Sequence, residues 1–449
     1  MFSPRLLEKD KQYLWHPYTQ MKDYEDESPI LIERADGICL YDHTGKMYYD
    51  TISSWWCNVH GHNHPQVSLA IRNQLEKLDH VLFAGFTHEN AILLAEQLVG
   101  ISPKNLTKVF YSDNGSTACE VALKMSFQFW KQTGKGKKER FIGLENGYHG
   151  DTIGAMSVGG TATFQQVFSP MLFPAYKAPS PYCYRCQFGK EKTDCNIECI
   201  QPLEKLLSEK HDRIAGLILE PLVQAAGGMI IYPVEYLKRA AKLASAYEVH
   251  LIVDEVATGF GRTGKMLAVE YADISPDFIC LSKGITNGTL PLAATLTTEE
   301  IYSAFYADYK ENKTFYHGHT YTANPLATAA ACASIKVFEE EMTLDHVQKL
   351  IPVFHQGMQR FADIPFVGDI RCLGMIGSLE LVKDRKTRQP FAFEERIGFK
   401  VYKEGLGKGL ILRPLGNVVY FFLPLCTKPQ ELEDILERTY ALLHGLFDQ

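Results

Sequence analysis

The sequence predicts an α/β protein with a mainly parallel β-sheet and a separate, smaller α+β domain. From residue 108 onwards, short β-rich apolar segments alternate with stretches of helical periodicity, the pattern that makes βαβ units. After about residue 340 the pattern changes to fewer, longer helices around a few strands. With 449 residues, the chain also exceeds the roughly 250–300 residues at which a single core stops growing.

Residues 1–60 are predicted to form an arm with a small sheet that belongs in part to the small domain. Residues 61–335 are assigned to the large domain, and residues 336–449 to the C-terminal small domain. Apolar, β-branched runs predict large-domain strands at 108–112, 140–144, 214–220, 250–255, 278–282 and 292–298. Helical spacing predicts helices at 117–130, 234–247 and about 324–338, and the small-domain strands are expected at 375–382, 410–415 and 418–425.

Composition narrows the classes of function. The net charge of −7 argues against a general surface for nucleic acid or anionic membranes, and it leaves room for a local basic pocket. The first 15 residues mix charges and lack the apolar run of a secretory signal, and no stretch approaches the ~18 apolar residues of a membrane span. We therefore expect a cytoplasmic protein with small-molecule partners.

Four of the 11 cysteines cluster in the sequence, whereas most of the others lie inside apolar runs. Cys183-x2-Cys186 is followed by Cys195-x3-Cys199, a spacing that a structural zinc ion could use. A loop with reduced thiols explains the same pattern, and we assign no metal ligand from sequence.

An acid and an amine follow two of the predicted strands. Asp254 and Glu255 end the run HLIV, and Lys283 follows the strand at 278–282. Ligands of open α/β sheets bind at this carboxyl edge. A lone lysine there is usually a solvated loop residue, but pyridoxal phosphate requires both a lysine for its Schiff base and a carboxylate against its pyridine nitrogen.

The phosphate of that cofactor needs backbone N–H groups at a helix start. Asp113-Asn114-Gly115-Ser116-Thr117 supplies such a start directly after a strand, with Gly115 permitting close approach and Ser116 adding a hydroxyl. Tyr148, which follows the strand at 140–144, offers a ring that could stack on the pyridine, although a structural tyrosine fits the spacing nearly as well.

Residues 259–265, GFGRTGK, match two nucleotide-binding patterns in form only. The G-x-G-x-x-G fingerprint should open a helix directly after its strand, but residues 254–258 intervene. As a P-loop, the segment ends in Met266, which lacks the hydroxyl group that binds magnesium. We therefore expect neither a dinucleotide nor a nucleoside triphosphate site.

These residues together resemble the class III aminotransferases over nearly the whole chain, through Asp254-Glu255-Val256-x-x-Gly259-Phe260-Gly261-Arg262-x-Gly264 and Ser282-Lys283-Gly284. The resemblance implies fold type I of the pyridoxal-phosphate-dependent transferases: a mainly parallel seven-stranded sheet with flanking helices, plus a smaller α+β domain. It implies a homodimer with active sites at the interface. The cofactor-binding residues that it implies are Gly115, Ser116, Tyr148, Asp254, Val256, Lys283 and, from across the dimer interface, Thr320.

Three further segments resemble the diaminopelargonic acid aminotransferases of biotin synthesis: Trp15-His16-Pro17-Tyr18-Thr19, Ser53-Ser54-Trp55-Trp56 and Arg413-Pro414-Leu415-Gly416. That resemblance implies conversion of 8-amino-7-oxononanoate to 7,8-diaminononanoate, with Lys283, Asp254 and Tyr18 acting in catalysis. Arg413 is expected to pair with the substrate carboxylate, and Arg262 to be a second polar anchor. The substrate-binding residues that it implies are Tyr18, Trp55, Tyr148, Arg262, Gly318 and Arg413.

The amino donor stays open at this point. The Trp55-Trp56 pair resembles the enzymes that use S-adenosylmethionine, the expected donor, whereas stretches such as KTFYHGHTYTAN resemble a lysine-using branch. Two other hypotheses remain: an aminotransferase for ornithine, 4-aminobutyrate or another ω-amine, and a binding module that has lost catalysis. The presence of both Lys283 and Asp254 argues against the second.

Overall fold

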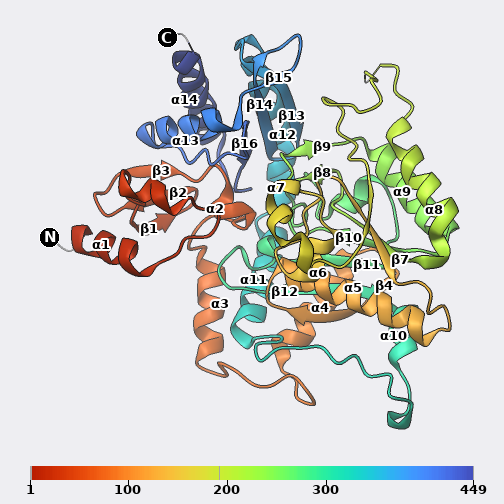
Figure 1. Cartoon of the computed structure of the whole chain (residues 1–449). Coiled ribbons are helices and arrows are strands. Elements are labelled where there is room, and N and C mark those ends of the chain that lie inside the picture. The colour runs from red at the N-terminus through yellow and green to blue at the C-terminus, as the bar shows by residue number, and fades with distance from the viewer. Residues whose placement is uncertain (1–2, 192, 448–449) are drawn as a thin grey trace.

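A mixed seven-stranded β-sheet lies at the centre of the computed structural model, which describes residues 3–191 and 193–447 (Figure 1). The strand order is β4-β12-β11-β10-β7-β5-β6. Its strands are β4 (Leu106–Ser112), β5 (Arg140–Leu144), β6 (Tyr176–Ala178), β7 (Ile214–Leu219), β10 (His250–Asp254), β11 (Phe278–Leu281) and β12 (Ala293–Thr298). The strands from β11 to β6 pair in parallel, and β12 runs antiparallel to both of its neighbours. The predicted parallel sheet is confirmed, with one reversed strand and the short, unpredicted β6.

Both faces of this sheet are buried, because alternate residues of each strand enter different cores. On β10, Ile252 packs against the helix α5 (Gly115–Gln132), whereas Leu251 and Val253 belong to the core on the opposite face. That second core continues into the C-terminal part of the chain, as far as Leu443. The strand ends are therefore held firmly from both sides.

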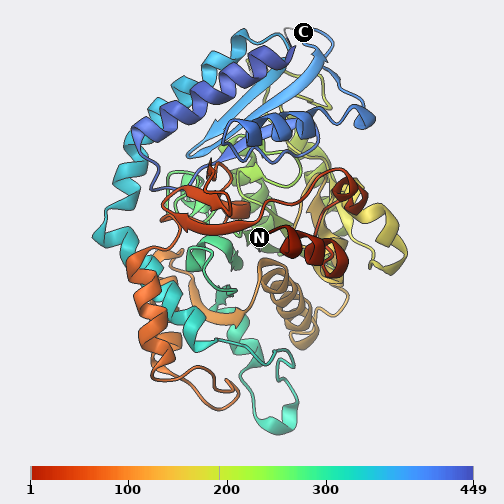
Figure 2. The same cartoon turned by 90° about the vertical axis from the view of Figure 1, so that its left-hand side faces the viewer.

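The remaining helices flank the sheet or build the two ends of the molecule. These helices are α1 (Ser3–Tyr13), α2 (Ser53–Trp56), α3 (Pro65–Leu75), α4 (Glu89–Ile101), α6 (Ile153–Val158), α7 (Ala162–Gln165), α8 (Gln201–Lys210), α9 (Val234–Ala246), α10 (Glu299–Phe305), α11 (Pro325–Glu340), α12 (Thr343–Gln359), α13 (Ile397–Gly407) and α14 (Pro429–Phe447). Figure 2 shows α14 running beside α12 at the C-terminal end.

Three small sheets accompany the large one. Antiparallel β1 (Ile32–Asp36), β2 (Cys39–Asp42) and β3 (Met47–Tyr49) form the N-terminal sheet. The C-terminal sheet contains β13 (Val367–Leu373), β14 (Ile376–Asp384), β15 (Gln389–Pro390) and β16 (Val418–Phe422), and β8 (Val223–Gln224) pairs with β9 (Ile230–Ile231).

The N-terminal arm is joined to the C-terminal part through its backbone. Tyr49 N donates to Gly409 O at 2.8 Å, and Phe422 N donates to Thr51 O at 2.8 Å. These bonds agree with an arm that shares the small domain, whereas the domain boundaries at residues 60 and 335 stay a prediction.

The strand predicted at residues 410–415 is wrong. Only isolated bridges form there, between Leu410 and Tyr49 and between Leu415 and Val418. Pro414 lacks the N–H that a ladder requires, and Leu410 N is already bonded to Gly405 O at the end of α13. This irregular segment carries Arg413.

Within the described residues, no helix has the length and apolar character needed to cross a membrane.

Candidate active site

The parallel pairing of β10 and β11 brings an acid and an amine to one edge of the sheet. Asp254 is the last residue of β10 and lies in register with Cys280 of β11, so Lys283 follows three residues beyond that register partner. Lys283 has a φ of +48°, a left-handed conformation that is uncommon outside glycine. The sharp turn directs the chain away from the sheet immediately after Ser282, whose hydroxyl group donates to Leu292 O at 2.8 Å.

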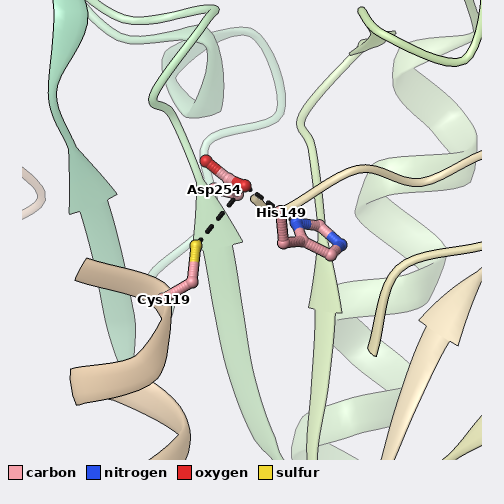
Figure 3. Close-up of side chains that lie close together, drawn as sticks. All are labelled: Cys119, His149 and Asp254. Carbon is pink, nitrogen blue, oxygen red and sulfur yellow. Dashed lines mark hydrogen bonds and ion pairs between the residues drawn. The ribbon is translucent and has the colours of Figure 1, made fainter. Parts of the chain in front are cut away.

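Asp254 is held by three neighbours, of which Figure 3 shows His149 and Cys119. Its Oδ2 lies 2.8 Å from His149 Nδ1 and accepts from the thiol of Cys119 at 3.5 Å, while Oδ1 accepts from Val256 N at 3.1 Å. The carboxyl group is almost fully buried. A carboxylate with two oxygens keeps acceptor capacity for one further donor.

The side chains of Asp254, His149 and Cys119 are of types that bind metals, and their ligand atoms lie within 4.8 Å of one another. Neighbouring Cys280, burial and the charge of Asp254 hold the pKa of the Cys119 thiol well above its usual range. A protonated thiol is a poor metal ligand, because the thiolate is the form that binds. We therefore interpret the cluster as support for the carboxylate.

Lys283 lies in a buried environment that disfavours its charge. Burial lowers the pKa of the ammonium group, and the negative charges of Asp254 and Glu220 oppose part of that shift. Its Nζ lies 4.9 Å from the centre of the Trp56 ring and makes no hydrogen bond to any described residue. The amine is therefore available to a ligand.

Glu220 is a buried acid of the site that the sequence reasoning missed. It directly follows β7, and its carboxyl oxygens accept from Tyr148 N at 3.0 Å and Ala225 N at 2.9 Å. Burial raises its pKa to about 8, and the charge of Asp254 adds to the shift. Its position after a strand, like that of Asp254, was the available signal.

The start of α5 presents free backbone donors beside the acid. Asn114 and Thr117 close a reciprocal capping box, which leaves the N–H groups of Gly115 and Ser116 without a partner among the described residues. A Cβ on Gly115 would lie 2.5 Å from Val256 Cγ1, so this helix start packs directly on Val256. The Ser116 hydroxyl pairs with that of Thr152 at 2.8 Å.

Aromatic side chains form the outer rim. The hydroxyl group of Tyr18 donates to both oxygens of Asp151, at 2.7 and 2.8 Å, and lies 3.4 Å from the hydroxyl of Tyr148. Its ring meets Trp55 edge-on, with centroids 5.6 Å apart. Tyr18 and Trp55 are 48% and 39% exposed, so their faces remain open to a ligand.

Arg413 joins this rim from the C-terminal part of the chain. Its guanidinium lies 4.3 Å from the centre of the Trp55 ring, and it forms no ion pair with any described residue. A partly exposed arginine without a carboxylate partner can receive an anionic group with its two-pronged fork.

Arg262 has a different environment, fully enclosed beneath the site. Its guanidinium donates to Leu423 O at 2.6 Å, Asn58 O at 2.5 Å and the Ser53 hydroxyl at 3.1 Å. Residues 259–265 form turns, and no helix opens there. These bonds favour a structural role for Arg262, so the anchoring of substrate by this residue stays a prediction.

Gly318 and Thr320 lie apart from these groups. Both are exposed, in the irregular segment between α10 and α11. Exposed aromatic rings accompany them in the same segment: Tyr306, Tyr309, Tyr316 and Tyr321. A surface of this composition fits contact with another chain.

Two further contributors were not among the predicted site residues. Trp56 ends α2, Asp151 lies in an irregular segment, and only the fold brings Trp56 to Lys283 and Asp151 to Tyr18. His149 directly follows Tyr148 and was not predicted as a site residue, although its ring makes the closest contact with Asp254.

Comparison with known proteins places this geometry in a family. The family model "Aminotransferase class-III" matches residues 20–443. The adenosylmethionine-8-amino-7-oxononanoate aminotransferase of Geobacter sulfurreducens is 45% identical over 98% of this chain and 97% of its own length, and that of Aquifex aeolicus is 47% identical over 97% and 96%.

Solved structures agree with the sequence comparisons. The adenosylmethionine-8-amino-7-oxononanoate aminotransferase of Methanocaldococcus jannaschii superposes with a TM-score of 0.94 at 41% identity, over 99% of both chains. The omega transaminase of Pseudomonas jessenii in complex with PMP gives a TM-score of 0.94 at 33% identity, over 99% of this chain and 98% of its own. With a family model that spans nearly the whole sequence and relatives well above 40% identity, this chain belongs to the class III aminotransferases.

Proposed function

We propose that this chain is a pyridoxal-phosphate-dependent transaminase that converts 8-amino-7-oxononanoate to 7,8-diaminononanoate with S-adenosylmethionine as the amino donor. The observation that carries the proposal is the meeting of Lys283 and Asp254 at one sheet edge, beneath a rim that presents Arg413. The names of the relatives from Geobacter and Aquifex support this choice of substrate and donor.

The residues present fit the proposed cofactor. The two N–H groups at the start of α5 would bind its phosphate, and Lys283 would attach it through an amine that has no other partner. Asp254 would bind the ring nitrogen, and Val256 and Tyr148 would enclose the ring. His149 adds an orphaned buried atom, because its Nε2 has no partner among the described residues.

Pyridoxal phosphate supplies a protonated, electron-withdrawing ring that stabilises the negative charge left when a substrate carbon loses its proton. Asp254 would hold the proton on the ring nitrogen, and His149 and Cys119 orient the carboxylate for that task. The Nζ of Lys283 would accept and return the substrate proton. Its lowered pKa enlarges the fraction of neutral amine that can act as a base near neutral pH.

The rim matches a long keto acid. Tyr18 and Trp55 provide aromatic walls for an apolar chain, and Arg413 provides a cation for its distant carboxylate. Asp151 fixes the Tyr18 hydroxyl, so this ring is already oriented before a ligand arrives.

A half-reaction tests the donor. Mixing the yellow holoenzyme with S-adenosylmethionine should bleach its cofactor absorbance in one turnover, and adding 8-amino-7-oxononanoate should restore it. Lysine, tested in parallel, should leave the absorbance unchanged. Bleaching with lysine alone would replace the proposed donor, and bleaching with ornithine or 4-aminobutyrate would favour an ω-amine transaminase instead, for which the omega transaminase neighbours are the precedent.

We also propose that the enzyme acts as a homodimer in which Thr320 of one chain contributes to the phosphate site of the other. The exposed segment that contains Gly318 and Thr320 supports this arrangement. Sedimentation at equilibrium should give the mass of two chains, and a Thr320→Ala variant should bind pyridoxal phosphate more weakly while remaining dimeric.

A further inference from the structure

The segment between β6 and the short helix η3 (Glu198–Ile200) has no part in the proposed active site. Its residues 179–197 contain neither helix nor strand in the described part of the chain. Figure 1 shows this yellow-green loop leading into α8. Loops of more than about 12–15 residues without secondary structure are uncommon and usually need a specific stabilising device. This loop contains Cys183, Cys186 and Cys195, and Cys199 follows it directly.

Folding brings both cysteine pairs around one small cavity, although the pairs are separated in sequence. The cavity has a volume of about 30 Å³. Apolar side chains of Phe188, Ile197 and Pro233 line it together with all four cysteines. It has room for an ion rather than for an organic ligand.

The backbone turns around the second pair. Ile197 adopts a left-handed conformation with φ +61°, which costs a β-branched residue roughly 1–2 kcal/mol. In this conformation its N–H points at Cys195 Sγ, 3.3 Å away. After the first pair, Gly189 turns with φ +63° and returns its N–H to Cys186 O at 3.2 Å.

Neighbouring elements hold both halves of the loop in place. Arg185, inside the first pair, donates through Nε to Glu380 of β14 at 2.6 Å. Arg388 donates to Tyr184 O at 2.6 Å, and Arg239 of α9 donates to Asn196 O at 2.9 Å beside the second pair. The cysteines are therefore part of a positioned structure and not of a solvated tail.

We propose that Cys183, Cys186, Cys195 and Cys199 bind one structural zinc ion as four thiolates. The chain supplies two ligand pairs of zinc-compatible spacing around one small cavity. Within the described residues, no three of these sulfur atoms lie within 4.8 Å of one another, so binding must draw them inward to the Zn–S distance of about 2.3 Å. The four thiols release four protons as the ion enters.

Four thiolates and one Zn²⁺ carry two negative charges, and Lys190, Glu191 and Glu198 line the same cavity. Cys195 donates to Glu198 Oε2 at 3.4 Å, and it gives up this proton on coordination. Glu198 then keeps Lys190 as its partner, 3.8 Å away.

The proposed ion would brace the loop behind the active site. Ser180 donates to Gln224, whose Nε2 donates to Glu145 O at 2.8 Å, three residues before Tyr148. We therefore expect loss of the ion to lower the melting temperature more than the rate of transamination.

Zinc content of the purified holoenzyme tests the proposal directly. Elemental analysis should find about one zinc per chain in the wild type, and a fall of about tenfold or more in Cys183→Ser/Cys186→Ser and in Cys195→Ser/Cys199→Ser. The control Cys39→Ser/Cys332→Ser removes two cysteines elsewhere and should keep its zinc. Lys283→Ala should also keep it, so this result is separable from the proposed catalytic function.

A second measurement serves if the serine variants do not fold. Wild-type protein expressed with Co²⁺ should show the intense thiolate-to-cobalt charge-transfer absorption, which added Zn²⁺ removes. Wild-type protein that binds neither ion from zinc-supplemented buffer would overturn the proposal. Retention of zinc in both double variants, or a mass that shows disulfides within the two pairs, would overturn it equally.

Discussion

The inner wall and the outer rim of the site are built differently. The inner wall consists of Asp254, His149, Cys119 and Glu220, which are buried. Asp254 is hydrogen-bonded to His149 and Cys119, and Glu220 accepts from the backbone N–H groups of Tyr148 and Ala225. The rim consists of Tyr18, Trp55 and Arg413, which are partly exposed and come from segments far apart in the chain. Ring contacts and a cation over an indole hold the rim together.

This difference separates two tasks. The inner wall must keep charges in place where water is excluded, and a reordering of it would leave polar groups unpaired at a cost of about 1–3 kcal/mol each. The rim has to admit and release substrates. Tyr18 and Trp55 both have left-handed φ values, of +50° and +72°, and such strained conformations are common at ligand-binding sites. We expect substitutions in the inner wall to affect the chemical step and substitutions in the rim to affect binding.

Lys283→Ala should have the largest effect. Removal of the only group proposed both to attach the cofactor and to move the proton should lower the rate of transamination by about 10⁴-fold or more. Lys265→Ala, which removes a nearby amine that donates to Glu270 O, should retain the wild-type rate. Stopped-flow measurement of one turnover distinguishes them, and a variant with a tenth of the normal rate would contradict the assignment of Lys283.

Asp254→Asn should come next, because an amide cannot hold a proton on the ring nitrogen. We expect kcat to fall about 10²- to 10³-fold, with a much smaller change in KM. The adjacent Glu255→Gln is the matched control, since Glu255 faces Thr258 and the backbone of Val269 instead. Both variants are compared by steady-state kinetics. Equal losses of kcat in Asp254→Asn and Glu255→Gln would contradict the role assigned to Asp254.

Arg413→Ala should raise the KM for the keto acid about 10- to 100-fold with little change in kcat, because it removes one charge-assisted contact. The KM of Arg413→Lys should lie between those of the wild type and Arg413→Ala, because lysine keeps the positive charge but cannot form the paired hydrogen bonds of arginine.

Arg262→Ala, by contrast, should destabilise the fold by about 2–4 kcal/mol, because it removes the donor to two buried carbonyl groups. Denaturant unfolding and keto acid titration separate these outcomes, and an unchanged KM for Arg413→Ala would remove its role.

Glu220→Gln should change the pH dependence of stability. The folded protein holds the Glu220 proton up to a pKa of about 8, whereas the unfolded chain releases it near 4.5. The folded state therefore binds more protons between these values, and this residue makes stability fall as pH rises from about 4.5 to 8. Glu220→Gln should reduce that slope by up to about 1.4 kcal/mol per pH unit. Identical slopes in unfolding experiments from pH 5 to 8 would contradict the prediction.

Of the inner wall, sequence reasoning reached Asp254, together with Lys283 beside it. Strand periodicity located β10 and β11, and their shared edge then required Asp254 and Lys283 to lie together. Glu220 ends a strand in the same way, but nothing local distinguishes it from a solvated glutamate.

The rim was beyond periodicity for a physical reason. Tyr18, Trp55 and Arg413 meet only through the pairing of the N-terminal arm with the C-terminal part, and the segment around Arg413 was wrongly predicted as a strand. Resemblance to a family supplied these residues, because left-handed backbone conformations at non-glycine positions leave no pattern in a single sequence.

The attachment point of the cofactor tests the account most directly. Reduction of the purified yellow enzyme with borohydride, followed by digestion and peptide mass spectrometry, should find a pyridoxyl phosphate group on the amine of Lys283 and on no other residue. Attachment to a different lysine, or a colourless protein that gains no mass on incubation with pyridoxal phosphate, would contradict the central claim that Lys283 and Asp254 hold the two ends of one ring.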